Sequence, residues 1–305
     1  MVEAPILFIA FNRPDTTKVV FQRLRELKPR KLYVTIDGPR EGRKQEVLLC
    51  DEVHEICKNI DWECQVKYKV REKNLGCRNA IVDAISWVLA IEDRVIIIED
   101  DVVPEFSFFD FANELLEKYK NDEKVGMISA NNYTPLEGSK EDYHFSNYAH
   151  IWGWATWRRA WNIFDIDCPE MKEQLKRRNF NNIISGKKER KYFKWFFNLW
   201  LDRKKKGTAD AWGPYWFFNI LFKNQFSIVP KSNLAKNIGT EGLHTNSQNS
   251  QHFRPTSSDY KIQSHPNKVI HSSKYDQYHF ENHIYQEVPP TILKRISIKF
   301  SNLIK

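Results

Sequence analysis

The sequence predicts an α/β protein built on a mostly parallel sheet with helices on both faces. Apolar runs of strand length alternate with segments of helical spacing through the first 130 residues. That alternation is typical of parallel strands joined by crossover helices. One run, Val95–Ile98, is wholly apolar and leads directly into three acidic residues. Parallel sheets of this kind bind ligands at the carboxyl ends of their strands.

The individual elements follow from periodicity and from turn residues. Pro14-Asp15 is a helix-start signal, and Val20, Leu24 and Leu27 then recur at helical spacing. The turn Asp37-Gly38-Pro39 closes the second strand. The predicted strands are Pro5–Phe11, Lys31–Ile36, a strand through Val66, Tyr68 and Val70, Val95–Ile98 and Val125–Ala130; the predicted helices begin at Pro14, Arg43, Cys77 and Phe106.

The sequence pattern changes after Ala130, where turn-rich, aromatic and basic segments replace the regular alternation of strands and helices. We therefore divide it into residues 1–130, which resemble a nucleotide-binding half, and residues 131–250, an acceptor-binding half of the same domain. Residues 251–305 form a C-terminal extension, with an amphipathic helix expected over 292–304. The apolar stripe and flanking cations of that helix favour either a membrane interface or packing on the protein's own core.

The charge balance indicates anionic partners without choosing among them. The chain has 47 basic and 39 acidic residues, a net charge of +8, and it contains ten Trp. A cationic surface suits nucleotides, phospholipids and nucleic acids alike. No aromatic–basic RNA-binding motif is found, so no nucleic-acid partner is expected. The basic runs Lys187–Lys194 and Arg203–Lys206 fit a solvated helix face, or a surface that attracts an anionic acceptor.

The five Cys include no C-x-x-C pair. Cys50 and Cys57 share a helical face with Val47 and Val53, which predicts buried apolar residues and a reducing compartment. No secretory signal opens the sequence, and no apolar run approaches the roughly 20 residues of a membrane span. We therefore expect a cytoplasmic protein, with peripheral contact to the inner face of the membrane as a further expectation.

The strongest chemical signal is the acidic triplet Glu99-Asp100-Asp101. Adjacent carboxylates at the end of a buried strand repel one another unless a cation or hydrogen-bond donors compensate them. Oxygen ligands of this kind suit Mg²⁺ or Mn²⁺. The alternative is a solvated acidic turn before the next helix. Arg13 and Asp37 follow the first and second strands at the same predicted sheet edge, where they could face a phosphate and a base or ribose.

Several segments in this order resemble the GT-A-fold glycosyltransferases, closest to the N-acetylglucosaminyltransferase I-like group and to bacterial family-2-like enzymes. The resemblance covers about four-fifths of the chain and ends near residues 237–245. The Glu-Asp-Asp element after a strand is its most specific part. The segments are Ile6–Pro14 (ILFIAFNRP), Leu32–Pro39 (LYVTIDGP), Asn74–Ala80 (NLGCRNA), Ile96–Pro104 (IIIEDDVVP) and Ile151–Trp157 (IWGWATW).

The resemblance implies a donor site and a metal site. It implies that Arg13 and Asp37 contact the nucleotide, Asp100 the ribose, and Asp101 a Mn²⁺ or Mg²⁺ ion that bridges the diphosphate. The triplet departs from a literal Asp-x-Asp, so the number of carboxylates on the metal stays open. It also implies donor contacts by Asn74 and Arg78, and His244 matches a position where some relatives use a metal or phosphate contact.

Two further assignments concern the acceptor. Asp210 lies in a short small-residue loop that resembles the family's catalytic-base region, so it is the expected base of an inverting displacement. Asp210 could instead cap the helix that follows, and Glu241 is the rival base. Four Trp between residues 152 and 161 recur at roughly helical spacing, which favours core positions. Trp154 is the one expected to stack on an acceptor sugar.

The sequence therefore predicts an inverting glycosyltransferase that uses a nucleotide-diphosphate sugar, with a UDP-sugar as the first expectation. The acceptor would be a glycan or a lipid-linked sugar, in bacterial surface polysaccharide synthesis. A sugar nucleotidyltransferase is an alternative, although Asn12-Arg13-Pro14 lacks the glycines of a phosphate loop. A non-catalytic carbohydrate-binding module is another alternative, but it would have no reason to gather carboxylates at a strand end.

Overall fold

A computed structural model gives the fold of the chain. It describes residues 2–133, 141–176, 180, 183–184, 186–239, 241–242, 245–246 and 255–284. The predicted helix 292–304 lies outside these residues, and so does His244. No helix in the described part of the chain is long and apolar enough to cross a membrane.

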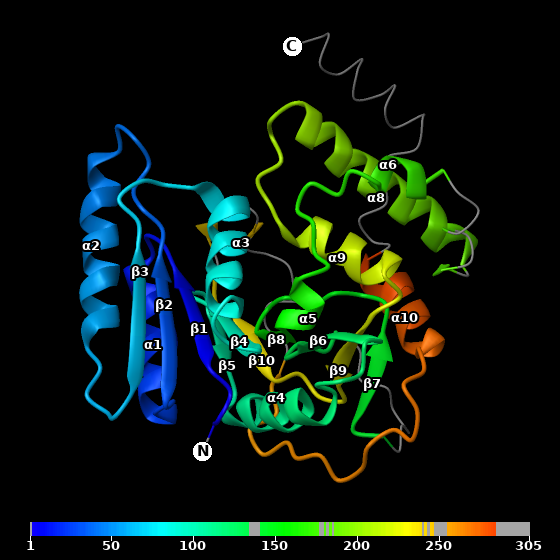
Figure 1. Cartoon of the computed structure of the whole chain (residues 1–305), viewed down its shortest axis with the longest axis horizontal. Helices are drawn as coiled ribbons and strands as arrows, with labels where there is room; N and C mark the ends of the chain where they lie inside the picture. Colours follow the sequence, from blue (N-terminus) through cyan, green and yellow to red (C-terminus); the bar gives the residue numbers. More distant parts are fainter. Residues whose placement is uncertain are drawn as a thin grey trace.

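The described residues form one mixed eight-stranded sheet in the order β3-β2-β1-β4-β8-β6-β9-β7 (Figure 1). Strands β1 to β4 are mutually parallel, β8 runs antiparallel between β4 and β6, and β7 closes the edge antiparallel to β9. The strands are β1 (Ile6–Ala10), β2 (Lys31–Ile36), β3 (Gln65–Val70), β4 (Arg94–Glu99), β6 (Val125–Ser129), β7 (Tyr143–Ser146), β8 (Trp154–Trp157) and β9 (Phe226–Pro230).

Two antiparallel pairs lie beside this sheet. β5 (Val102–Pro104), which directly follows the acidic triplet, pairs with β10 (Ala235–Asn237). β11 (Glu241–Gly242) pairs with β12 (Thr245–Asn246). The β5–β10 pair therefore brings a segment from late in the chain to the end of β4.

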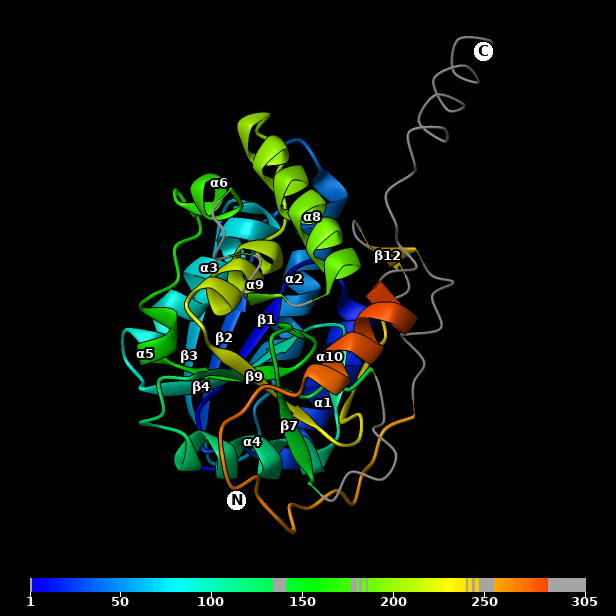
Figure 2. The ribbon, with the colours of Figure 1, turned by 90° about the vertical axis from the view of Figure 1, so that its right-hand side faces the viewer.

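Helices cover both faces of the sheet (Figures 1 and 2). Apolar side chains of α1, α2 and α4 share one core cluster with one sheet face, whereas α3, α5 and α9 pack on the other. Burial of these apolar faces is the main driving force for the arrangement. The helices are α1 (Pro14–Leu27), α2 (Lys44–Lys58), α3 (Gly76–Leu89), α4 (Phe106–Lys118), α5 (Arg158–Trp161) and α9 (Gly213–Phe222).

A third, aromatic-rich cluster stabilises the second half of the chain. It joins α9 to α6 (Met171–Gln174), α8 (Lys187–Lys205) and the π-helical turn η2 (Phe280–Ile284), which follows α10 (Ser273–His279). Asp276 of α10 accepts hydrogen bonds from the Asn147 backbone N–H, at 2.8 Å, and from Ser146. Part of the predicted C-terminal extension therefore packs against β7.

The predicted α/β class, with helices on both faces of the sheet, is confirmed. This is the architecture that the GT-A resemblance implies. The antiparallel strand β8 was not anticipated, because the helical spacing of its Trp residues hid a strand whose residues are buried on both faces. Cys50, Val53 and Cys57 are buried as predicted, but Val47 is 43% exposed and lies outside that face.

Candidate active site

Arg13 lies between the two aspartates that follow β4. Its Nη1 donates to Asp101 Oδ2 at 2.8 Å, and its Nη2 pairs with Asp100 Oδ1. Asp100 Oδ2 also accepts a hydrogen bond from the backbone N–H of Phe11 at 3.2 Å. The carboxyl ends of β1 and β4 are adjacent in the sheet, so residues 87 to 89 positions apart meet here. One guanidinium thus compensates both carboxylates.

Arg13 does not fully offset the burial and mutual repulsion of the three carboxylates. Burial, followed by the charges of Asp101 and Asp100, raises the pKa of Glu99 to about 8. Burial also raises the pKa of Asp100 to about 6, against the opposing effect of Arg13. Burial alone would lower the pKa of Arg13, but the two aspartates hold it well above its ordinary value. The cluster therefore favours any further cation that reaches it.

A glycine lets the segment after β10 pass directly over Asp101. The Ile238 N–H donates to the Asp101 backbone carbonyl at 2.7 Å, and Gly239 N–H donates to Asn237 Oδ1 at 2.9 Å. A Cβ atom at Gly239 would lie 2.5 Å from Asp101 Oδ2, so only glycine fits without moving that carboxylate. Sequence analysis missed this contact. The sequence feature that could have indicated this contact is a glycine two residues after a short strand.

Asp37 and Asn74, which are each expected to contact the donor, contact each other in the structure. Asp37 is 6% exposed and accepts hydrogen bonds from the Leu75 N–H at 3.0 Å and from Asn74 Nδ2 at 2.9 Å. Leu75 is the N-cap residue of α3 and makes no side-chain capping bond of its own. Asp37 therefore satisfies the start of α3 in place of a capping side chain. Burial nevertheless raises the pKa of Asp37. A contact with the nucleotide stays a prediction for both residues.

Arg78 connects α3 to the second half of the chain. Its Nη2 donates to the Ile166 carbonyl at 3.0 Å and lies 3.5 Å from the carboxylate of Asp167. The guanidinium also lies 5.1 Å from the ring centroid of Tyr215 in α9. The structure thus gives Arg78 partners at the junction of the two halves, and a contact with the donor stays a prediction.

The prediction that Trp154 stacks on an acceptor sugar is wrong. Trp154 lies in the central strand β8 and is 0% exposed. Its ring stacks on Trp212 with 5.4 Å between centroids and also packs on Trp216. An acceptor cannot reach either face of an indole that is already covered, so Trp154 belongs to the core.

Asp210 lies on the same side as the triplet. Burial is the main cause that raises the pKa of the Cys77 thiol to about 12, and the charges of Glu99, Asp210 and Asp101 raise it further. Cys77 remains accessible to solvent at the start of α3. Each of these three carboxylates therefore lies within electrostatic reach of Cys77. Sequence analysis did not place Cys77 here, because only the chain's path from β3 into α3 does so.

Asp210 is not the N-cap residue of the helix that follows it. Helix α9 begins at Gly213 with Trp212 as its N-cap residue, two positions after Asp210. Asp210 is exposed in the turn before this helix. Its role as a base stays a prediction.

Glu241 begins strand β11, three residues after the Ile238 backbone that contacts Asp101. The side chain of Glu241 and all of His244 lie outside the described structure. Among the described residues, no three His, Cys, Asp or Glu side chains converge as ligands for one metal ion.

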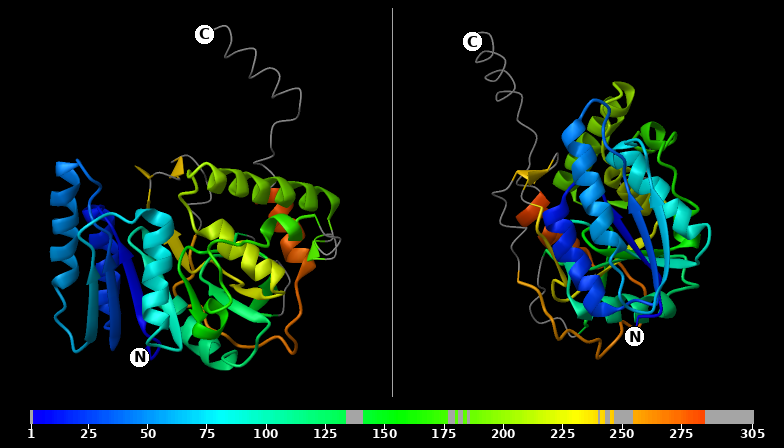
Figure 3. Two further views of the ribbon diagram at one scale, coloured as in Figure 1. Left: turned by 45° about the horizontal axis from the view of Figure 1, so that its top comes forward. Right: turned by 90° about the vertical axis from the view of Figure 1, so that its left-hand side faces the viewer.

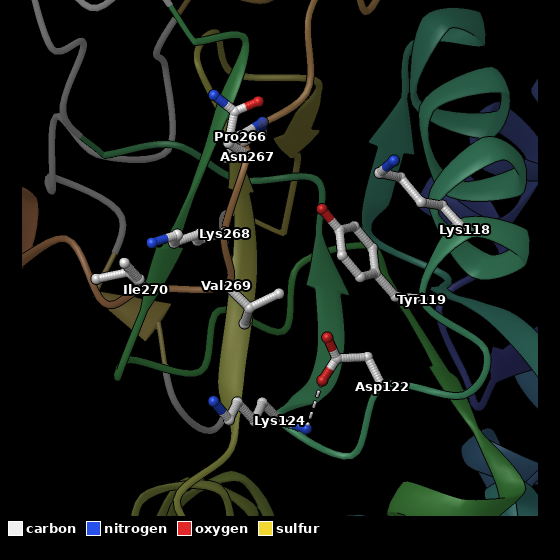
Figure 4. A pocket seen from close by; sticks show the side chains of 9 residues that line it. All are labelled: Lys118, Tyr119, Asp122, Lys124, Pro266, Asn267, Lys268, Val269 and Ile270. Carbon is white, nitrogen blue, oxygen red and sulfur yellow. Dashed lines mark hydrogen bonds between the residues drawn. The ribbon is translucent and has the colours of Figure 1, made fainter.

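The two surface depressions found lie elsewhere. The larger, of about 580 Å³, is lined by Lys118, Tyr119, Asp122, Lys124 and the segment 266–270 (Figure 4). The smaller, of about 380 Å³, includes Arg94 at the amino end of β4. Both are at the opposite end of the strands from Asp101. Because carboxyl strand ends are where such sheets bind ligands, and because Arg13, Asp100 and Asp101 meet there, we assign the site to that end.

Comparison with known proteins finds similarity in overall structure only. No protein-family model matches the chain, and no curated protein matches it in sequence. Mouse xyloside xylosyltransferase 1 superposes with a TM-score of 0.34 and 11% identity, over 72% of this chain and 81% of that one. A putative glucose-1-phosphate thymidylyltransferase from Bacillus anthracis superposes with a TM-score of 0.32 and 10% identity, over 58% and 77%. At these scores the likeness assigns neither an activity nor a substrate.

Proposed function

We propose that the chain is a glycosyltransferase that moves a sugar from a nucleotide-diphosphate donor onto a hydroxyl acceptor. The observation that carries the proposal is the pair Asp100 and Asp101 at the carboxyl end of β4, held by Arg13 from the neighbouring strand end. A diphosphate needs cationic partners there, and the chain supplies one guanidinium together with carboxylates that suit a divalent ion.

The residues present fit Mg²⁺ or Mn²⁺. Mg²⁺ is usually held by one or two carboxylates together with substrate phosphates. Asp101 is the principal ligand proposed here, with Asp100 as the second, because the side chain of Asp101 is the more exposed of the two, at 13% against 3%. When bound, the ion neutralises the diphosphate as it leaves. Arg13 would then contact phosphate oxygens in place of the carboxylates it now binds.

The acceptor hydroxyl requires a base on the side away from the leaving diphosphate. A carboxylate in this position takes the proton as the new bond to the anomeric carbon forms, and attack from the opposite face inverts the configuration. Asp210 is the proposed base because it is exposed and because its charge, like those of Glu99 and Asp101, acts on the Cys77 thiol. Glu241 remains the rival, since its backbone follows the segment that touches Asp101.

A panel of sugar nucleotides tests the proposal. We expect one donor, with UDP-sugars tested first, to be hydrolysed slowly in the presence of Mn²⁺ and to be spared when EDTA is added. A sugar nucleotidyltransferase would instead release pyrophosphate from a nucleoside triphosphate and a sugar 1-phosphate. Pyrophosphate release without donor hydrolysis would overturn the transferase, and the absence of both reactions would favour a carbohydrate-binding module.

A further inference from the structure

Helix α8 carries most of the chain's excess positive charge. Its 19 residues include eight Lys and Arg and two acidic residues, a net charge of +6, whereas the whole chain has a net charge of +8. One of the two acidic residues, Glu189, is bonded to Tyr148 inside the protein. The positive charge is therefore concentrated on one element instead of being spread over the surface.

Four of the five exposed lysines of α8 lie on one face, which we call the stripe. Lys187, Lys191, Lys194 and Lys205 are exposed and recur at the spacing of one helical face. The opposite face, with Phe193, Phe197 and Trp200, packs in the aromatic-rich core. No ion pair between residues that the structure describes includes Lys187, Lys191 or Lys194. Within the part of the chain that the structure describes, these three lysines of the stripe thus have no ion-pair partner.

The stripe lies at the same end of the molecule as the candidate active site. The parallel strands run from the N-terminal end of the molecule toward the end where α8 crosses the second half (Figures 1 and 3). Trp195 lies half-buried beside the stripe, and an indole is well suited to the boundary between headgroups and water. A surface that met α8 would therefore face the end of the sheet where Asp101 lies.

We propose that the α8 stripe docks on the anionic phospholipid surface of a membrane, which makes a lipid-linked sugar the acceptor presented to the site. This inference rests on the proposed transferase function for the acceptor, although the docking itself does not. The cluster Lys187, Lys191 and Lys194 spans about 10 Å along the helix, and its charge is complementary to that of an anionic surface. Its cations are lysines, which attract phosphates as point charges, and arginine is the residue usually enriched where nucleic acids are bound specifically.

Vesicle co-sedimentation tests the docking without any substrate. The parent protein should bind phosphatidylglycerol-containing vesicles at low salt, and its binding should weaken as the salt concentration increases. It should not bind vesicles of pure phosphatidylcholine. The triple variant Lys187→Glu, Lys191→Glu, Lys194→Glu should lose about a hundredfold or more in affinity, because each basic residue near an anionic surface contributes about fivefold. The matched control Lys118→Glu, Lys261→Glu, Lys268→Glu makes the same charge change at the opposite end and should keep most of the binding.

Several outcomes would overturn the docking. The docking is wrong if the parent protein does not bind anionic vesicles, or if both triple variants lose the same amount of affinity. It is also wrong if RNA displaces the vesicles at a lower concentration than the lipid, or if binding is lost only when residues 292–305 are deleted. A Lys→Gln version of the stripe variant, with an unchanged melting temperature, guards against misfolding and should lose affinity to a smaller extent. Donor hydrolysis in solution should be the same in the stripe variant and the parent. If neither the parent nor the variants hydrolyse any donor but the parent still binds vesicles, the transferase proposal is rejected and the docking proposal is kept.

Discussion

Arg13 Nη1 lies 2.8 Å from Asp101 Oδ2, and through its other terminal nitrogen the same guanidinium holds Asp100. The cation comes from the end of β1, and the carboxylates come from the end of β4, its neighbour in the sheet. The side chain of Asp100 is only 3% exposed, so its charge depends on this partner. A divalent ion that bound these carboxylates would therefore take the place of Arg13 beside them. Arg13 would then be available to contact the phosphate.

We predict that Arg13→Met destabilises the metal-free protein by about 3 kcal/mol, because removal of one partner leaves a buried charge uncompensated. Methionine preserves much of the side-chain length and its packing. Urea unfolding in EDTA measures the effect. The double variant Arg13→Met, Asp101→Asn should recover part of the loss, since it removes one of the two repelling carboxylates. An Arg13→Met unfolding curve that superimposes on that of the parent would contradict the assignment.

Asp210→Asn should lower turnover by ~10²-fold or more and leave donor affinity and melting temperature near those of the parent. The structure sharpens this expectation because Asp210 is exposed and does not cap α9. Single-turnover transfer assays would measure the loss. Glu241→Gln is the matched variant: if it abolishes transfer and Asp210→Asn does not, the base is Glu241.

The stability of the fold should depend on pH through two buried histidines. Burial lowers the pKa of His144 to about 3, and burial with neighbouring charges does the same to His150. In the unfolded chain both would titrate near 6.5. Below that pH the unfolded state binds more protons, so the free energy of unfolding should fall as pH decreases from about 6.5 toward 3.

The size of this effect is about 2 kcal/mol per histidine between pH 7 and pH 5. His144 Nε2 has no hydrogen-bond partner among the described residues, and its ring packs on Tyr275. His144→Phe should therefore be tolerated at pH 7 and should flatten the pH dependence. Urea titrations at several pH values give the slopes. Equal slopes for parent and variant would show that His144 is not a source of the effect.

The first half of the fold could be predicted because its signals are local. The bounds of β2 match the apolar run Lys31–Ile36, and those of β1 and α2 lie within one residue of the prediction. Polar residues after these strands indicated the correct sheet edge, since parallel strands end together. The pairing of Arg13 with both aspartates did not follow, because strand order in the sheet cannot be read from one sequence.

The second half was predicted poorly because its strands carry no clear alternation. Trp154 and Trp157 are buried on opposite faces of β8, so apolar and polar residues do not alternate along it as they do in a half-buried strand. The spacing of the four Trp suggested a helix instead. The interpretation of Trp154 as an exposed platform failed for the same reason. Gly239 could not be placed either, since its importance depends on a contact with Asp101 across more than 130 residues.

Thermal unfolding with nucleoside diphosphates is the most direct test of the central claim, which is that Asp101 and a divalent ion together hold the donor. A ligand that binds only the folded state stabilises it by RT ln(1 + [L]/Kd), about 2.7 kcal/mol at a hundredfold excess over Kd. We predict that one of UDP, GDP, dTDP or CDP raises the melting temperature of the parent only when Mn²⁺ or Mg²⁺ is present. In Asp101→Ala this rise should disappear while the ligand-free protein stays folded. A rise of equal size in Asp101→Ala, or in EDTA, would contradict the claim.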